Sequence, residues 1–479
     1  MHKFIIHRIS LLVLLYPLFF STIAYGAGTT AIPQPDDPDK LQYQPIQFIP
    51  PQAQRVVLDN GIILYVVEDH ELPILNISAV IRTGSNYDPV GKEGLAELTG
   101  TVMRTGGTNS MSGSAIDDAL DFFAGSITVS MNRDSGSINL SVLKKDLDEG
   151  LNIFTQILTN PAFEENKIKL AKDLKIEELR RIADDPQKLA FREFKRLLYD
   201  DNPAGRFPSV TTVKNIQRDD LVQFYRSFFY PGNIMIAVTG DISKEDAISK
   251  IKDNLGSWKG AKKIYDLPPI PVKQKGHTYF LFKDIPQSII ISAQFAPGKK
   301  EPDAYPFEIL DFIAGSGGFR SLIFHKVRNN LGLAYSTGSF YTKKSEYGVF
   351  GAYAITKSES TMEVLILIHS IINDLRNNII DKKEIDRAIR SINNNFIFSF
   401  LSAKQIAYQQ LMIEYEHLPE DYLITYRDRI AQVTAEDIKK MAVKYLSTDE
   451  SVTLVVGNEN VYKQMLTTFG NVKRIESKL

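Results

Sequence analysis

Apolar and polar residues recur with two different periods along this chain, and these periods predict its strands and helices. Residues 55–58 and 62–67 are predicted to be strands joined at Asn60-Gly61, a dipeptide favoured in hairpin turns. From Gly94 the apolar positions are spaced by three to four residues, as on the buried face of a helix. In the rest of this half we expect helices at 114–123, 146–158, 164–182 and 186–199, and strands at 76–82 and 234–239.

The same order of elements returns in the second half, after a proline-rich stretch at 267–271. Residues 220–240 and 437–457 show the repeat directly, because each reads as a helix, a short connection and a buried strand that ends in Gly. We expect strands at 279–282, 289–295, 335–342 and 346–355, and helices at 304–314, 319–329, 359–377 and 381–397. The predicted fold is therefore α+β, with two homologous domains that each have a mainly antiparallel sheet and helices packed on one face. The predicted boundaries are 51–260 for the first domain, 261–273 for the linker and 274–479 for the second domain.

The N-terminus follows a different pattern. Lys3 and Arg8 precede an apolar run at 11–23, and small residues stand at positions 24 and 26. This pattern predicts a secretory signal peptide over 1–26, while the alternative of an uncleaved anchor helix is disfavoured by Pro17 and the short run. A Pro-rich leader is expected at 27–50. The chain contains no cysteine and so has no disulfide framework. Since a secreted chain without cysteine is typical of the bacterial periplasm, we expect a protein of the Gram-negative periplasm.

Composition and charge exclude several kinds of function. The formal net charge of the 479 residues is -1, which gives no electrostatic basis for binding nucleic acid or an anionic membrane. The absence of cysteine excludes a cysteine peptidase, and no serine stands in a Gly-x-Ser-x-Gly turn. The glycines at 315, 317 and 318 lack the Gly-Lys-Ser/Thr ending of a phosphate-binding loop.

Three motifs carry a resemblance to a known family. They are Arg82-Thr83-Gly84-Ser85-Asn86-Tyr87-Asp88-Pro89 with the glycine-rich residues after it, Asp201-Asn202-Pro203-Ala204-Gly205, and Gly315-Ser316-Gly317-Gly318-Phe319 running into Arg328-Asn329-Asn330-Leu331-Gly332-Leu333-Ala334-Tyr335. In this order and spacing the chain resembles the pitrilysin/insulinase family of zinc peptidases, which includes the mitochondrial processing peptidase. The resemblance implies two peptidase-like domains that enclose a cavity with a partner subunit.

The zinc-binding motif of that family is degenerate here. Its His-x-x-Glu-His places histidines at the positions of Glu97 and Thr101 and the catalytic glutamate at Gly100. The family's third ligand is a glutamate that falls at Glu177 or Glu178. A zinc ion needs about three good protein ligands, and two carboxylates with one hydroxyl bind it poorly. We therefore expect no metal in this chain and no general base at Gly100, and Glu97 is either a residual ligand or a solvated or hydrogen-bonded glutamate.

Substrate-handling positions are implied by the same resemblance. The substrate-facing strand reads Gly125-Ser126-Ile127-Thr128-Val129, without the Asn-Ala step of active members. Backbone pairing of Thr128 and Val129 with an extended peptide can still form, but the side-chain contact is lost. Gly315, Gly317 and Gly318 are expected to form a flexible loop over a peptide-binding chamber, as in the non-catalytic processing-peptidase subunit.

The Arg/Tyr pair of such peptidases is retained, because Arg328 and Tyr335 stand seven residues apart. In the family this pair reaches the zinc site of the opposite half or of the partner, where arginine binds the carbonyl oxygen and tyrosine donates to the tetrahedral centre. The alternative is that Arg328 only favours a helix C-terminus and that Tyr335 only starts a strand.

The resemblance therefore implies a non-catalytic subunit of a periplasmic heterodimeric zinc metallopeptidase. Zinc is expected in a paralogous partner subunit, peptides are the expected substrates, and the chain alone is expected to be inactive. The alternative is a catalytically inert structural or peptide-binding protein. A further possibility is residual activity with an unusual metal.

Overall fold

The computed structural model describes residues 46–260, 267–270, 276–464 and 466–477. The expected signal peptide at 1–26, residues 27–45 of the leader, and most of the predicted linker lie outside these ranges. From Phe48 onward the chain forms one unit. Within the described ranges, no helix is both long and apolar enough to cross a membrane.

The first half of the chain forms a six-stranded sheet in the order β1-β2-β6-β3-β5-β4. Only the neighbours β2 and β6 run parallel, and the other neighbours are antiparallel. The strands are β1 (Gln54–Val57), β2 (Ile63–Glu68), β3 (Ile74–Ile81), β4 (Ser126–Met131), β5 (Gly136–Leu143) and β6 (Ile234–Gly240). The helices are α1 (Leu95–Thr105), α2 (Gly113–Phe122), α3 (Leu147–Thr159), α4 (Glu165–Asp184), α5 (Pro186–Tyr199), α6 (Val210–Asn215), α7 (Arg218–Phe228) and α8 (Lys244–Leu255).

The second half forms another six-stranded sheet, in the order β12-β7-β11-β8-β10-β9. Its strands are β7 (His277–Phe282), β8 (Gln287–Ala296), β9 (Ala334–Lys343), β10 (Gly348–Lys357), β11 (Val452–Gly457) and β12 (Val472–Ile475). Its helices are α9 (Ala304–Asp311), α10 (Thr361–Asn377), α11 (Lys382–Ile397), α12 (Ala403–Tyr415), α13 (Tyr422–Ala431) and α14 (Ala435–Tyr445).

The two sheets have matching strand orders. The series β2-β6-β3-β5-β4 corresponds to β7-β11-β8-β10-β9, and both sheets combine a parallel pair with antiparallel neighbours. Only the outermost strand differs, because β1 comes from the start of the first half and β12 from the end of the second. The expected α+β fold with two related sheet-and-helix domains is confirmed.

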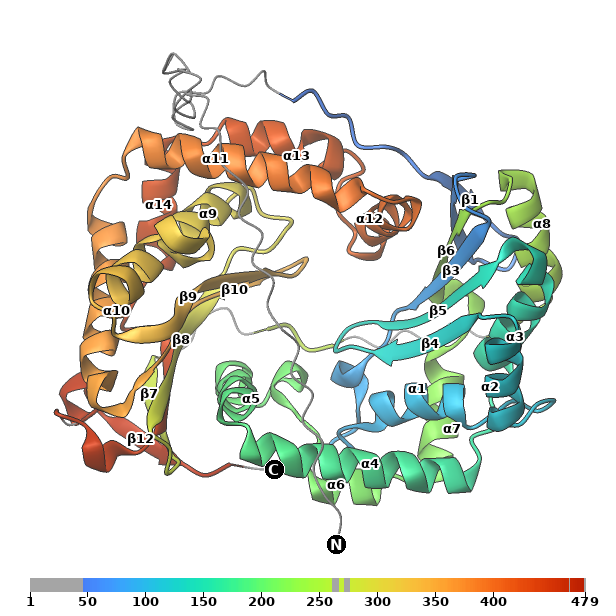
Figure 1. The fold of residues 1–479 in the computed structure, drawn as a ribbon, viewed down its shortest axis with the longest axis horizontal. Coiled ribbons are helices and arrows are strands. Elements are labelled where there is room, and N and C mark those ends of the chain that lie inside the picture. The colour runs from blue at the N-terminus through green and yellow to red at the C-terminus, as the bar shows by residue number, and fades with distance from the viewer. Residues whose placement is uncertain (1–45, 261–266, 271–275, 465, 478–479) are drawn as a thin grey trace, which may run out of the picture. The chain divides into compact units, whose positions relative to one another are not determined.

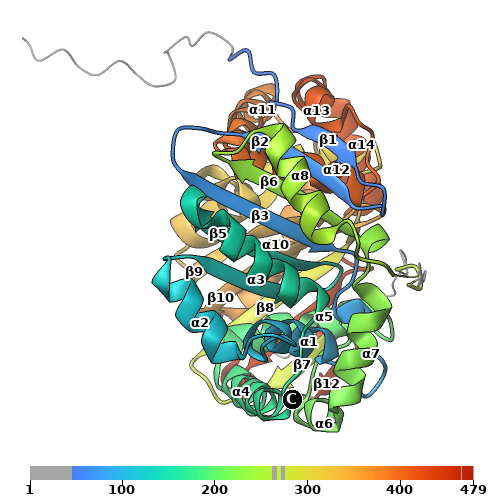
Figure 2. The same ribbon diagram turned by 90° about the vertical axis from the view of Figure 1, so that its right-hand side faces the viewer.

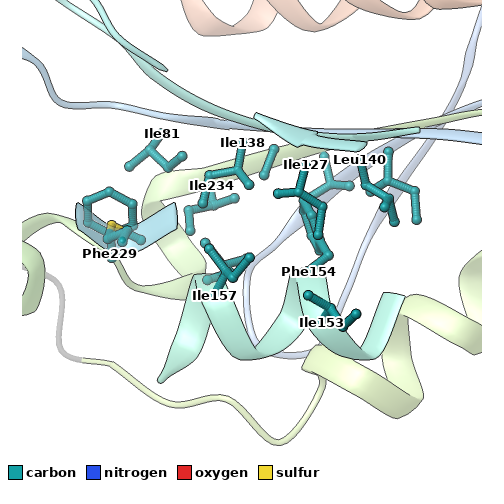
Figure 3. Close-up of a cluster of buried hydrophobic side chains, with 14 of the residues drawn as sticks. Ile81, Ile127, Ile138, Leu140, Ile153, Phe154, Ile157, Phe229 and Ile234 are labelled. Carbon is teal, nitrogen blue, oxygen red and sulfur yellow. The ribbon is translucent and has the colours of Figure 1, made fainter. Parts of the chain in front are cut away.

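Each sheet carries a hydrophobic core beneath its own helices. In the first half, Ile153, Phe154 and Ile157 of α3 share one helix face and pack on the sheet, where Ile138 and Leu140 of β5 point toward them (Figure 3). Figure 2 shows α2 and α3 in front of this sheet. A separate core lies in the second half between its sheet and α9, α10 and α14.

The opposite face of each sheet is covered by a helix from the other half. Helix α5 of the first half packs through Leu189 and Phe194 on strands β8 and β11. In the reverse direction, α12 of the second half packs through Ala407 and Leu411 on β2, β3 and β6. In Figure 1, α5 lies beside β8 on the side away from α10, and α12 lies beside β6 on the side away from α8. The two halves therefore exchange one helix each.

Several predicted elements agree closely with the structure, and others do not. Helix α5 begins and ends as predicted, because the Asp185 carboxylate caps its first turn and Pro186 occupies its first position. The predicted helix 304–314 changes at Phe312 into a π-helical segment, Phe312–Ser316, and the predicted helix 319–329 is a 3-10 turn at Gly318–Arg320 followed by a π-helical segment, Phe324–Asn330. Strands β5 and β12 and helices α6, α8, α12 and α13 are not among the predicted elements.

Candidate functional site

A buried carboxylate fixes the start of α1, the helix that carries the substituted metal positions. Asp88 accepts hydrogen bonds of 2.8 Å from the backbone N–H groups of Gly94 and Ala96. Gly94 adopts a φ of 104°, which glycine tolerates without strain, and so turns the chain into the helix. Burial raises the pKa of Asp88 to about 7, against the opposing effect of the two backbone hydrogen bonds. The first motif of the resemblance thus positions the helix that follows it.

A lysine joins two positions of the degenerate metal site, Glu97 and Glu178. The Nζ atom of Lys175 on α4 lies 2.7 Å from both carboxylate oxygens of Glu97 on α1. The same Nζ atom donates to Glu178, one turn further along α4, at 3.1 Å. The side chain of Lys175 is 10% exposed, whereas those of Glu97 and Glu178 are 42% and 49% exposed. Glu177, the other candidate for the third ligand, instead forms an ion pair with Arg180.

The position of the family's catalytic glutamate is buried and crowded. A Cβ atom added to Gly100 would lie 2.6 Å from Cγ of Met131 and 3.3 Å from Cγ1 of Val129, both on β4. The side chain of Met131 therefore occupies the space beside the helix that a longer residue at position 100 would need. Thr101, one residue further along, is exposed.

This arrangement does not suit a zinc ion. Among the described residues, no three or more His, Cys, Asp or Glu side chains gather into a possible metal site. Zinc needs several nitrogen, sulfur or oxygen donors around one point, and the carboxylates of Glu97 and Glu178 are already bound to an ammonium group. The donor set at this place therefore does not fit the metal that the family resemblance implies.

Strand β4 lies at the edge of the first sheet and carries the predicted substrate-contact residues. It pairs with β5 alone, so its other edge has no strand neighbour within that sheet. Thr128 is exposed and Val129 is partly buried. An edge strand presents unpaired backbone groups, to which an extended peptide can be added as a further strand.

The structure brings Arg328 and Tyr335 together. The guanidinium carbon of Arg328 lies 5.4 Å from the ring centroid of Tyr335 and 4.8 Å from that of Phe324. Such distances are within the range of cation–π attraction. Arg328 belongs to the π-helical segment Phe324–Asn330, and Tyr335 is the second residue of the edge strand β9. The Tyr335 side chain is 79% exposed, so the pair is presented at the surface of this chain.

The three predicted glycines differ in their surroundings. The expected loop is instead a π-helical segment through Ser316 and a 3-10 turn from Gly318. Gly315 is buried, and an added Cβ atom would lie 2.2 Å from the backbone nitrogen of Ser339 on β9. A Cβ atom added to Gly317 would clash with Phe312 in the preceding helical turn. Gly318 is exposed, has a φ of 75°, and has space for an added Cβ atom. Gly315 therefore permits close packing against β9, and Gly318 is the residue that faces open space.

Two residues at this site, Lys175 and Met131, are not among the predicted site residues. Lys175 stands three residues before Glu178 on a predicted helix, a spacing that places both side chains on one face. That signal was available in the sequence. Met131 gave no local signal, because its contact with Gly100 arises only when β4 packs against α1.

Comparisons with known proteins find relatives over most of this chain. The insulinase (peptidase family M16) model matches residues 65–208, and the model described as the peptidase M16 inactive domain matches residues 215–392. An "Uncharacterized zinc protease" of Rickettsia felis is 23% identical over 411 residues, which cover 84% of this chain and 97% of the relative. The "Non-peptidase homolog YmxG" of Helicobacter pylori is 23% identical over 403 residues, which cover 82% of this chain and 91% of the relative.

Solved structures show the same fold. The crystal structure of a peptidase M16 inactive domain from Pseudomonas fluorescens matches with a TM-score of 0.79 at 22% identity, over 86% of this chain and all of that one. Fold and site together define a two-domain protein of the metallopeptidase-like class. The chain belongs to the pitrilysin/insulinase family, peptidase family M16.

Proposed function

We propose that this chain is the non-catalytic subunit of a periplasmic heterodimeric zinc metallopeptidase. In this assembly a paralogous partner subunit binds the zinc ion, and this chain supplies Arg328 and Tyr335 to the partner's site during peptide hydrolysis. The observation that carries the proposal is the contrast between the two halves. The first half holds an ion pair where the family binds metal, while the second half presents the Arg/Tyr pair at its surface.

The chemistry of the pair fits this role. Among the described residues, Arg328 contacts the rings of Phe324 and Tyr335, and no carboxylate of these residues forms an ion pair with it. The ring of Tyr335 supports the guanidinium, and no hydrogen bond within the described part of the chain occupies its hydroxyl. Arg328 can therefore bind the developing oxyanion of a peptide carbonyl, and Tyr335 can donate a second hydrogen bond to it.

Peptide binding by this chain is proposed at the open edge of β4 and at the turn that begins at Gly318. The open edge of β4 at Thr128 and Val129 offers backbone pairing to an extended substrate. The turn at Gly318 lies ten residues before Arg328, and its open surroundings suit the approach of a peptide backbone. No cofactor is assigned to this chain, and zinc is assigned to the partner.

Further support comes from relatives and from the N-terminal sequence. The Helicobacter pylori relative is named as a non-peptidase homologue, whereas the Rickettsia relative is named as a zinc protease. The family thus contains proteins named in both ways at similar distances from this chain. Secretion to the periplasm is proposed from the charged and apolar pattern of residues 1–26.

The test is co-expression with a family member from the same genome that carries an intact His-x-x-Glu-His. Arg328→Ala should leave the complex assembled, as judged by size-exclusion chromatography, and lower kcat for peptide hydrolysis roughly 100-fold or more, since one oxyanion donor is lost. Tyr335→Phe, which removes only the hydroxyl, should also lower kcat. Arg390→Ala, at an exposed arginine of α11, is the matched control and should leave kcat unchanged.

The alternative function gives the opposite results. If the chain is a structural or peptide-binding protein, no zinc-bearing partner will co-purify, or a complex will form whose turnover is unaffected by Arg328→Ala. Either result would refute the shared-site proposal.

A further inference from the structure

At the degenerate metal site of the first half, the side chains of Lys175 and Met131 occupy the space. Lys175 extends from α4 toward α1, and its ammonium group contacts three carboxylate oxygens from two helices. Most surface lysines keep the charged end in water, but the side chain of Lys175 is only 10% exposed. Its position is therefore set by the packing of the two helices as well as by the charge.

The two carboxylates that bind this ammonium are those at the family's ligand positions. Glu97 stands at the first histidine position, and Glu178 is one of the two candidates for the third ligand. Seventy-eight residues separate Lys175 from Glu97, so this contact depends on the tertiary fold. A divalent cation at this point would need the same oxygens and would be repelled by the ammonium a few ångströms away.

The space beside Gly100, where the family has its catalytic glutamate, is occupied by the side chain of Met131. Met131 lies where a side chain at position 100 would begin, as the 2.6 Å distance from the added Cβ atom shows. Gly100 is buried, and β4 packs along α1 at this level. The ammonium group of Lys175 on α4 therefore stands where the family has its cation, and the side chain of Met131 on β4 stands where it has its general base.

We propose that Lys175 is a built-in cation that takes the place of the metal, holds α1 to α4 through Glu97, binds Glu178 on its own helix, and keeps divalent metal out. The role of Lys175 is independent of Arg328, Tyr335 and any partner subunit. It also implies that restoring histidines alone will not restore metal binding.

The experiment uses the full mature chain without a partner. Glu97→His/Thr101→His places two imidazoles one turn apart on α1, with Glu178 available as the third ligand. This double variant should remain zinc-free after incubation with zinc chloride and dialysis. Adding Lys175→Met, which keeps a long apolar stem and removes the charge, should raise the content to about one zinc ion per chain, measured by atomic emission.

Two further variants in the same histidine background separate charge from packing. Lys175→Arg keeps a cation at this place and should remain zinc-free. Lys169→Met removes an exposed lysine of the same helix, which lines the pocket between α4 and the Lys214–Arg218 segment, and should also remain zinc-free. Circular dichroism and a thermal melt establish that each variant is folded, and Lys175→Gln replaces Lys175→Met if that variant does not fold.

Two outcomes would overturn the proposal. Stoichiometric zinc in the double variant with Lys175 present would show that the lysine does not exclude metal. A zinc-free chain after removal of the Lys175 charge would show that it does not occupy an otherwise usable site. Neither outcome bears on the Arg328 experiment, because zinc content is measured on this chain alone and not through peptide hydrolysis.

Discussion

Leu411→Ala tests whether α12 holds the two halves of this protein together. Leu411 has no exposed surface and packs against Tyr65, Val80 and Met235 of the first sheet, although it belongs to the second half. It is absent from the two main cores, so its removal leaves each half's own core unchanged. The substitution therefore weakens the contact between the two halves without creating a cavity in the main core of either half.

The expected cost follows from the burial of the side chain. Replacing a fully buried leucine by alanine removes its transfer free energy and leaves a cavity, at a cost of about 2–5 kcal/mol. We expect α12 to stay docked, because Glu414 at its end accepts hydrogen bonds from Arg55 at 2.7 and 2.8 Å and from the Tyr65 hydroxyl at 2.5 Å. The contact between halves should be weakened and not lost.

Urea unfolding followed by two probes measures the effect. Trp258 is the single tryptophan of the chain and packs against the first core, so its fluorescence reports on the first half, while far-UV circular dichroism reports on the whole chain. In the variant, both midpoints should fall, and the two transitions should separate because the halves support each other less. The control is Ile424→Ala on α13, where the side chain is 52% exposed and the change should stay within about 0.5 kcal/mol.

A loss below about 1 kcal/mol from Leu411→Ala would refute this reasoning, since a buried leucine that bridges two halves should cost more. Coincident transitions displaced by the full amount would show instead that α12 contributes stability to the chain as a whole without coupling two separable halves.

Two other substitutions test features of the candidate site. Gly315→Ala should lower the free energy of unfolding by about 1–3 kcal/mol, because its Cβ atom would lie 2.2 Å from the backbone of Ser339, and an unchanged melting temperature would contradict the close packing on β9. Asp88 has a pKa of about 7 in the fold against 3.8 for the ordinary group, so the folded chain holds the extra proton between these values and this contribution to stability is lost as pH rises through about 7. Asp88→Asn should flatten that part of the unfolding free energy measured against pH, and an unaltered slope would contradict the buried, raised pKa.

Local signals in the sequence located much of the fold. Strands β1 and β2 form the hairpin expected at Asn60-Gly61, where Gly61 has a φ of 93°. Helix α5 was located because Asp185 and Pro186 mark a helix start. The alternating apolar residues Ile138, Leu140 and Val142 of β5 carry an equally clear strand signal, although this strand is not among the predicted elements.

Other features depend on tertiary packing and have no local signal. The π-helical segment Phe324–Asn330 that orients Arg328 is not distinguished by periodicity from an α-helix. The contact of Met131 with Gly100 exists only because β4 packs along α1. The motif spacing predicted that Arg328 and Tyr335 form a pair. The distance of 5.4 Å between the guanidinium carbon and the ring centroid depends on the turn between the π-helical segment and β9, which the spacing does not describe.

The exchange of α5 and α12 makes this chain resemble a dimer whose subunits happen to be covalently connected. Each half would leave an apolar sheet face in water if it were made alone, because the helix that covers that face is encoded in the other half. The connection between the halves then acts mainly by raising the effective concentration of one for the other. Selection on either sheet face is thereby tied to a helix that the other half of the chain encodes.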